Sequence, residues 1–112
     1  MLRGRITKVW DLDTAKAYID KVHEKFAECR RQFGSVRYLL DSAAMPMQSQ
    51  EVQAVMIDVS AFRAGDRYAS VTDTALTRLG SKRLLAEMSL PCEWSVFDNM
   101  ADAERWLVED RD

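Results

Sequence analysis

The chain has 112 residues, of which 47% are hydrophobic and 30% are charged, and this balance is typical of one globular domain. A chain of this length buries enough surface to fold without a structural metal or a disulfide, so we expect residues 1–112 to form a single domain. The net charge of −2 argues against nucleic acid as a partner, and no apolar run approaches the ~20 residues of a membrane-spanning helix.

The two cysteines, Cys29 and Cys92, are far apart and match no spacing that is typical of a metal site or a redox motif. The basic N-terminus lacks the apolar core of a signal peptide, so we expect a cytoplasmic protein with reduced thiols. One disulfide between the two cysteines is the alternative. We expect neither a metal ion nor a cofactor. Positively charged residues are concentrated in the first third of the chain. This uneven charge either orients a partner or a second copy of the chain, or it only reflects solvent-exposed faces.

The first predicted strand covers about residues 2–10, and a helix follows it from about Asp13 to Arg31. Asp13 is the expected N-cap, and Gly34 is the expected C-terminal stop. Apolar residues recur every three or four positions along this helix and predict one buried face, formed by Ala15, Tyr18, Ile19, Val22, Phe26, Cys29 and Phe33.

The second strand, residues 36–40, is the most apolar, which predicts burial on both faces as in a parallel sheet. A loop over residues 43–47 leads to a second helix from about Ser49 to Arg63. The predicted apolar face of this helix contains Val52, Val55, Met56, Val59 and Phe62.

The third strand covers residues 67–72, and Asp73 is expected to cap a helix from about Thr74 to Met88, which Gly80 interrupts. The side chains predicted to point inward from this helix are Leu76, Leu79, Leu84 and Met88.

The fourth strand covers residues 93–97, and Asn99 caps the last helix, from Met100 to about Glu109. Asp102 stands three residues after this cap, in a position like that of a capping box. The residues predicted to be buried from this helix are Met100, Ala103, Trp106 and Leu107.

Four successive strand–helix units predict an α/β fold with a mainly parallel four-stranded sheet. Crossovers between parallel strands are right-handed, and with so few strands the helices are expected to pack mostly on one face.

One carboxylate follows each predicted strand, namely Asp11, Asp41, Asp73 and Asp98. Because open parallel sheets bind ligands beyond the carboxyl ends of their strands, these positions are the first candidates for a site. Aspartate is also common at turns and helix starts, so capping explains each position without a function. The alternative is an enzyme in which several of these carboxylates converge on a cation or a substrate proton.

The loop after the second strand is the other candidate site. Met45 and Met47 flank Pro46 and offer an adaptable apolar lip to a ligand or partner, or else pack beneath the second helix. His23 is the only histidine and is expected on the surface of the first helix. The chain contains no glycine-rich phosphate loop, no nucleophile motif and no metal-ligand pair, so we expect no catalytic activity.

Three stretches resemble STAS/SpoIIAA-like domains, in particular a bacterial branch of this family. Residues 4–7 are similar to its opening strand and residues 36–41 to its central strand with a terminal aspartate. Its closing half is similar to residues 67–73, 94–97 and 101–107. The resemblance implies a sheet of stacked strand–helix units and a role as a regulatory partner of other proteins, with lipid binding among relatives of similar fold.

In the anti-sigma-factor antagonists of that group, a serine in an Asp-Ser-Ser-Gly-like motif is phosphorylated. The resemblance makes Ser42, after Asp41, a candidate for such a switch, although Ala43 and Ala44 depart from the motif. A phosphate there would add nearly two negative charges and repel an acidic partner.

We therefore expect a non-catalytic STAS-like module that binds another protein or itself, including as a homodimer. A carrier of a small apolar ligand or lipid is the alternative, and an enzyme that uses the strand-end carboxylates is the second alternative. The candidate binding residues are Asp41, Ser42, Met45, Met47 and Asp73.

Overall fold

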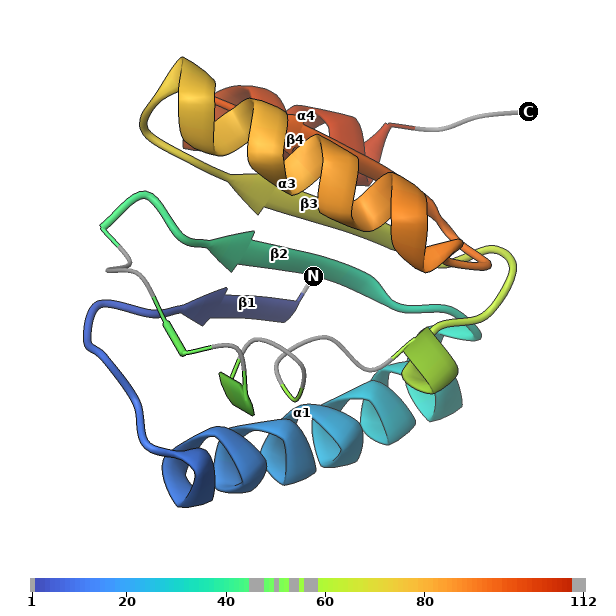
Figure 1. The fold of residues 1–112 in the computed structure, drawn as a ribbon. Helices are drawn as coiled ribbons and strands as arrows, with labels where there is room; N and C mark the ends of the chain where they lie inside the picture. Colours follow the sequence, from blue (N-terminus) through green and yellow to red (C-terminus); the bar gives the residue numbers. More distant parts are fainter. Residues whose placement is uncertain (1, 45–47, 50, 53–54, 56–58, 110–112) are drawn as a thin grey trace.

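The computed structural model describes residues 2–44, 48–49, 51–52, 55 and 59–109, and the strands form one four-stranded sheet (Figure 1). Neighbouring strands are parallel, and their order in the sheet follows their order in the chain. The predicted α/β class and parallel sheet are therefore confirmed. The strands are β1 (Leu2–Arg5), β2 (Arg37–Asp41), β3 (Arg67–Val71) and β4 (Glu93–Phe97).

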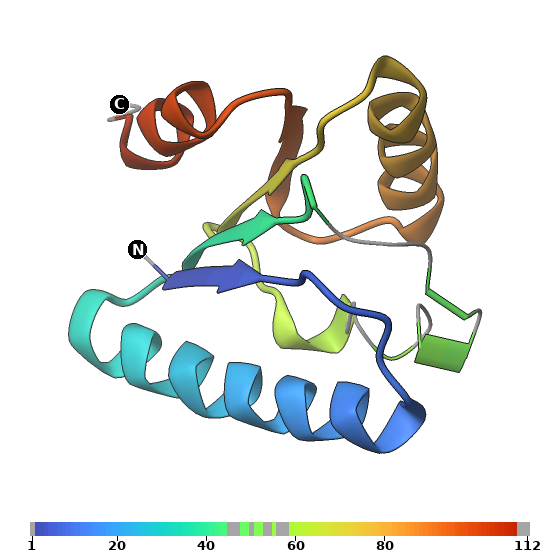
Figure 2. The same ribbon diagram turned by 90° about the vertical axis from the view of Figure 1, so that its left-hand side faces the viewer.

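Helices cover both faces of this sheet, and the two longest share one face (Figure 2). Helix α1 (Leu12–Phe33) joins β1 to β2, α3 (Ala75–Met88) joins β3 to β4, and the 3-10 turn η1 (Val59–Ala61) precedes β3. Crossovers of one hand that advance in one direction along a sheet place their helices on the same face. Helix α4 (Met100–Val108) follows the last strand, makes no crossover and packs on the opposite face.

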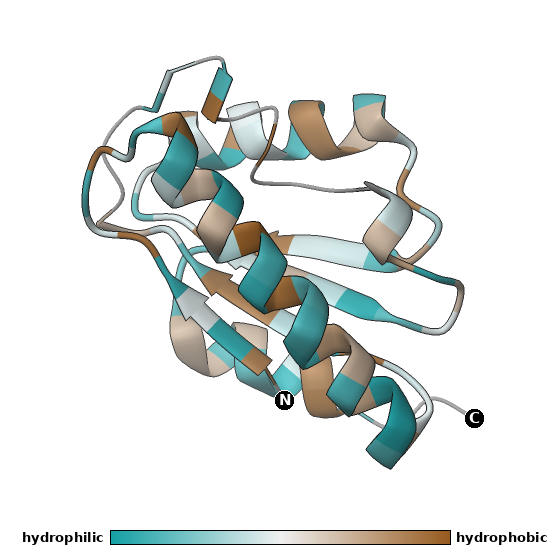
Figure 3. Cartoon of the chain, turned by 90° about the horizontal axis from the view of Figure 1, so that it is seen from below, coloured by the Kyte–Doolittle hydropathy of each residue, from teal (hydrophilic) through white to brown (hydrophobic). Residues whose placement is uncertain are grey.

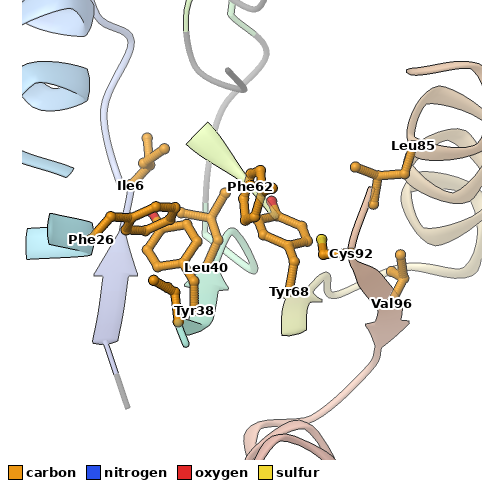
Figure 4. Close-up of a cluster of buried hydrophobic side chains, with 10 residues drawn as sticks. Ile6, Phe26, Tyr38, Leu40, Phe62, Tyr68, Leu85, Cys92 and Val96 are labelled. Carbon is orange, nitrogen blue, oxygen red and sulfur yellow. The ribbon is translucent and has the colours of Figure 1, made fainter. Parts of the chain in front are cut away.

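The larger core lies between the sheet and helices α1 and α3, and aromatic rings are prominent in it (Figure 4). The centroid of the Phe26 ring of α1 lies 5.4 Å from those of Tyr38 and Phe62. The Phe62 and Tyr68 rings are 5.5 Å apart. All three pairs meet edge to face, which is an arrangement that the ring quadrupoles favour. This layer fixes α1 and the segment before β3 to the same two strands.

The smaller core lies between the sheet and α4. Leu39 of β2 and Ala69 of β3 pack there against Ala103 and Leu107, and all four side chains are fully buried. The last four residues of β2 are buried, because its alternate side chains enter the two cores. The predicted burial of β2 on both faces is therefore confirmed.

Strand β1 is shorter than predicted, because it ends at Arg5 and not near residue 10. Its ladder partner β2 ends at Asp41, and the backbone N–H of Ile6 donates to the Asp41 carbonyl at 3.3 Å. Residues beyond Ile6 therefore have no parallel strand to pair with. The N-cap of α1 is consequently Asp11, whose carboxylate accepts from the Thr14 N–H at 2.7 Å, and not Asp13.

Three residues of the predicted face of helix α1 are buried and three are half-buried, but Phe33 is 71% exposed. A helix of 22 residues spans about 33 Å, whereas a five-residue strand spans about 17 Å. The helix therefore extends past the strands, and its last turn has no sheet to cover. Gly34 ends the helix, as predicted, and it does so in the left-handed conformation, with φ of 80°. Hydrophilic and hydrophobic residues alternate along α1 in Figure 3, and its buried residues are Ala15, Ile19 and Phe26.

Helix α3 turns a different face inward from the one predicted. Leu76, Leu79 and Leu84 are 81%, 57% and 42% exposed, whereas Leu85 is buried. The helix packs against β4 at the edge of the sheet, so only a narrow stripe of it meets the core. The spacing of the leucines in the sequence did not show which side of α3 faces the sheet. Its N-cap is Thr74, whose hydroxyl accepts from the Thr77 N–H at 3.1 Å, and not Asp73.

The last helix agrees with expectation in its cap and in two of its four predicted buried residues, since Met100 and Trp106 are half-buried. Asn99 caps α4, and Ala103 and Leu107 are its buried residues.

The predicted second helix does not continue to Arg63, because residues 59–61 form the 3-10 turn η1 and Phe62 and Arg63 lie in neither a helix nor a strand. Parts of the predicted second helix, including Met56, lie outside the described residues, but Val52 and Phe62 of its expected apolar face are buried. Among the described residues, no helix combines the length and apolar character needed to cross a bilayer.

Candidate functional site

The carboxyl ends of the strands bring Asp41 and Ser42 close to β1 and β3. Arg5 and Asp41 are neighbours in the register of β1 and β2, and the Arg5 Nε donates to the Asp41 Oδ2 at 3.0 Å. Asp41 also accepts from the Ala43 N–H at 3.2 Å. These bonds hold the Asp41 side chain at the end of the strand, and the residue is 8% exposed.

The hydroxyl of Ser42 is tied to the end of β3. Both the backbone N–H and the side-chain Oγ of Ser42 donate to the Val71 carbonyl, at 3.0 and 2.8 Å. The residue is 7% exposed. A kinase would reach this hydroxyl only after the strand end opens, because the oxygen is held inside the fold.

The other strand-end carboxylates are separate and exposed. Asp11 caps α1, and the bonds from Thr14 hold the pKa of its carboxyl below the usual value. Asp98 lies 3.5 Å from an Arg78 nitrogen, and Asp73 stands just outside α3. Within the described ranges, no three acidic, histidine or cysteine side chains gather closely enough to hold a metal ion. The strand-end carboxylates therefore form no such cluster within these ranges.

Met45 and Met47 lie outside the described residues, but Gln48, which follows them, is buried. Its Oε1 accepts from the Trp10 N–H at 2.9 Å, and its Nε2 donates to the Lys8 carbonyl at 2.7 Å. Gln48 thus joins the chain after β2 to the connection after β1. No pattern in the sequence singled it out, because a lone glutamine carries no periodic signal.

A cavity of about 330 Å³ lies at the opposite edge, near the amino end of β2. The overhanging end of α1 forms one wall, and the residues that line the cavity are Cys29, Phe33, Ser35 and Arg37. The volume falls at the lower end of the range for small-molecule sites.

Asp66, at the start of β3, carries the densest set of polar contacts at this edge. It is 1% exposed and accepts from both terminal nitrogens of Arg30, at 2.9 and 2.7 Å. Burial raises the pKa of its carboxyl, but the bonds from Arg30 and from the N–H groups of Val36 and Arg63 outweigh this, and the pKa lies below its usual value. In the sequence, Asp66 lies in the short connection between the predicted second helix and third strand, where no pattern indicated a site.

Two tyrosines form a second buried polar contact, beside β1. The hydroxyls of Tyr18 and Tyr38 are hydrogen-bonded to each other next to Gly4. Burial raises the pKa of both, so both hydroxyls stay protonated at neutral pH. Their hydrogen bond joins α1 to β2 across the larger core.

The outward side of α3 is the largest departure from expectation. We call it the α3 outer face and define it as Leu76, Leu79, Gly80, Arg83 and Leu84, all of which are exposed. On an α-helix these positions share one side, at about 100° per residue. Large apolar side chains gathered on one face of a soluble domain mark an interaction surface more often than chains scattered singly.

Comparisons of the chain with protein-family models, with curated proteins and with solved structures found no match.

Proposed function

We propose that this chain is a non-catalytic protein-interaction module, of the STAS/SpoIIAA-like type that its sequence resembles, and that it docks a protein through the α3 outer face. The observation that carries the proposal is the exposure of Leu76 and Leu79 on that face. Each buried leucine side chain contributes about 1.5–3 kcal/mol, so a partner that covers them gains substantially.

The charges around the leucines suit a protein partner. Lys82 and Arg83 are exposed on the same helix, next to Leu79 and Leu84. An apolar centre with a polar, solvent-accessible rim is the usual anatomy of a protein–protein interface. Both cysteines are free, which supports the proposal of a reducing, cytoplasmic location.

The test compares affinity-tagged wild type with the Leu76→Gln/Leu79→Gln variant in capture experiments from the native cells. We expect the variant to lose the captured protein, whether a different chain or a second copy, while its unfolding midpoint changes little because the sites are exposed. Phe33→Gln is the matched control, since Phe33 is equally exposed but lies on α1. Equal capture by wild type and both variants would contradict the proposal.

A carrier of a small ligand is the second candidate, and the cavity beside Phe33 and Arg37 supports it. An aromatic ring next to a guanidinium suits an apolar molecule with an anionic group. Native mass spectrometry of gently purified protein would detect the added mass. A bare polypeptide mass under these conditions would leave the interaction module as the only candidate.

A further inference from the structure

We propose that the cavity at the end of α1 binds a small aromatic carboxylate, whose ring lies against Phe33 and whose carboxylate pairs with Arg37. This inference rests on the carrier function named above as the second candidate, and it deepens that function by giving the chemical class of the ligand. Three observations carry it: an arginine that has no acidic partner, the side chains around it, and the size of the space.

Arg37 lines the cavity from the first position of β2 and is half-buried. In the register of the sheet it lies directly opposite Arg67, the first residue of β3. Like charges placed opposite each other in this way repel. The charge of Arg67 is compensated within the chain, because its guanidinium donates to two backbone carbonyls near the end of α4, at 3.3 Å each, and lies 3.7 Å from the Glu93 carboxylate.

The charge of Arg37 has no such compensation. No ion pair among the described residues involves it. Glu28, in the second half of α1, lies 3.4 Å from the Lys25 ammonium. Asp66 is held by Arg30. An anion in the cavity would therefore supply the charge that the chain does not, and a carboxylate matches the fork of a guanidinium with two parallel hydrogen bonds.

The other lining side chains favour an aromatic ring beside that carboxylate. Phe33 gives the cavity an aromatic wall, against which a second ring packs well. Cys29 is a free, half-buried thiol, and sulfur makes favourable contacts with aromatic rings. The Ser35 hydroxyl can donate to a carboxylate oxygen. Apolar walls with a few polar groups that orient the ligand are the usual composition of a small-molecule site.

The size of the cavity favours a compact ligand. Its volume of about 330 Å³ lies near the bottom of the range of roughly 300–1,000 Å³ that small-molecule sites occupy. One ring that carries a carboxylate suits such a space. A membrane lipid does not, because an arginine and a serine interrupt the apolar wall that a long acyl chain would need.

The first test is an NMR titration of the isotope-labelled chain with benzoate. We expect saturable binding with a Kd on the order of 1 mM, because the probe is small. Benzyl alcohol has the ring without the charge, and inorganic phosphate has the charge without the ring. Each should bind about tenfold more weakly than benzoate. Equal binding by either probe, or no binding of benzoate, would overturn the proposed ligand class.

The second test removes the guanidinium. Arg37→Gln should weaken benzoate binding about tenfold, whereas Arg37→Lys keeps the charge without the fork and should lose less. Arg31→Gln is the matched control, because Arg31 is an exposed arginine at the same end of α1 and is not among the described lining residues. Circular dichroism establishes that each variant is folded. Undiminished benzoate affinity in folded Arg37→Gln would contradict the inference.

The third test places the probe in the cavity. Cys29 lines it, so saturating benzoate should slow the reaction of this thiol with an uncharged disulfide reagent severalfold. The labelling rate in Arg37→Gln should respond little to the same benzoate concentration. Benzoate that binds the wild type yet leaves the labelling rate unchanged occupies another surface, and this result would also overturn the inference.

Failure of this inference is distinguishable from failure of the functions proposed above. An apolar mass in native mass spectrometry that persists in Arg37→Gln keeps the carrier and overturns the carboxylate class. A bare mass together with no benzoate binding removes both. Capture through the α3 outer face is independent of the cavity, so the Leu76→Gln/Leu79→Gln variant should bind benzoate as the wild type does.

Discussion

Asp66 and Arg30 form a buried, two-pronged ion pair, with nitrogen–oxygen distances of 2.9 and 2.7 Å, that joins the last turns of α1 to the start of β3. The same Arg30 also donates to the Ala61 carbonyl at 2.7 Å. The Asp66 carboxylate also accepts hydrogen bonds from the backbone N–H groups of Val36 and Arg63. The Asp66 side chain thus connects the end of α1, the start of β2 and the turn before β3.

Breaking this pair should be strongly destabilising. Arg30→Ala or Asp66→Asn leaves a buried polar partner unsatisfied, and removal of one member of a buried pair costs about 3–5 kcal/mol. Urea unfolding followed by circular dichroism measures the loss. Asp20→Asn, at an exposed position on α1, is the matched control and should stay within about 0.5 kcal/mol of wild type. An equally small change for Asp66→Asn would show that the pair contributes little.

The contribution of Asp66 to the free energy of unfolding should depend on pH. The pKa of Asp66 in the folded chain lies below its usual value of 3.8, so the folded state favours the ionised carboxylate. Its contribution is fully present above the unfolded pKa and is lost as the pH falls through the folded pKa. The difference in unfolding free energy between wild type and Asp66→Asn should therefore be constant near neutrality and shrink below about pH 4. A difference that persists into strong acid would rule out this linkage.

Gly4 should tolerate no side chain. A Cβ there would meet the Tyr18 and Tyr38 hydroxyl oxygens, the latter at 2.7 Å. Gly4→Ala should therefore destabilise the fold by about 1–3 kcal/mol, as overpacking does. Adding Tyr38→Phe removes one of the clashing oxygens and should recover part of the loss. Gly80→Ala is the opposite control, because open space surrounds that position, and dilute protein should gain about 0.5–1 kcal/mol.

The two thiols should differ sharply in reactivity. Burial raises the pKa of Cys92 to about 11, and its side chain is buried against the core, whereas Cys29 is partly exposed. Only the thiolate reacts, so a disulfide reagent at neutral pH should label one thiol quickly and the second only on unfolding. Cys29→Ser should abolish the fast phase. Loss of the slow phase instead would reverse the assignment.

A negative charge at Ser42 should destabilise the fold itself, whether or not a partner is bound. Ser42→Glu removes a hydroxyl bonded to the Val71 carbonyl and places a carboxylate beside the buried Asp41. We expect a loss of about 1–3 kcal/mol, since a buried polar group is left unpaired. Ser42→Ala should cost less, because it adds no charge. A Glu variant as stable as wild type would show that the strand end opens readily and would strengthen the case for a phosphorylation switch.

Strands β2 to β4 and the caps at Gly34 and Asn99 were predictable because they depend on local signals. Asn99 and Gly34 act where side-chain and backbone preferences operate over a few residues. The errors have a common origin in tertiary geometry. Phe33 and Leu76 have the spacing of buried residues, yet their exposure depends on where the sheet ends and which neighbour a helix has. The Asp41 and Asp66 contacts likewise join residues about 36 positions away in the chain, which no local pattern reports.

The sequence by itself determined an α/β domain with a parallel four-stranded sheet, because strands that alternate with helices require crossovers of one hand. The tertiary structure alone decided which side of each helix is left uncovered. A helix at the edge of a four-stranded sheet meets a narrow core, so the leucine stripe of α3 can face either way with nearly the same local pattern. Packing against β4 selected Leu85 and left Leu76, Leu79 and Leu84 on the surface, where the proposed partner binds.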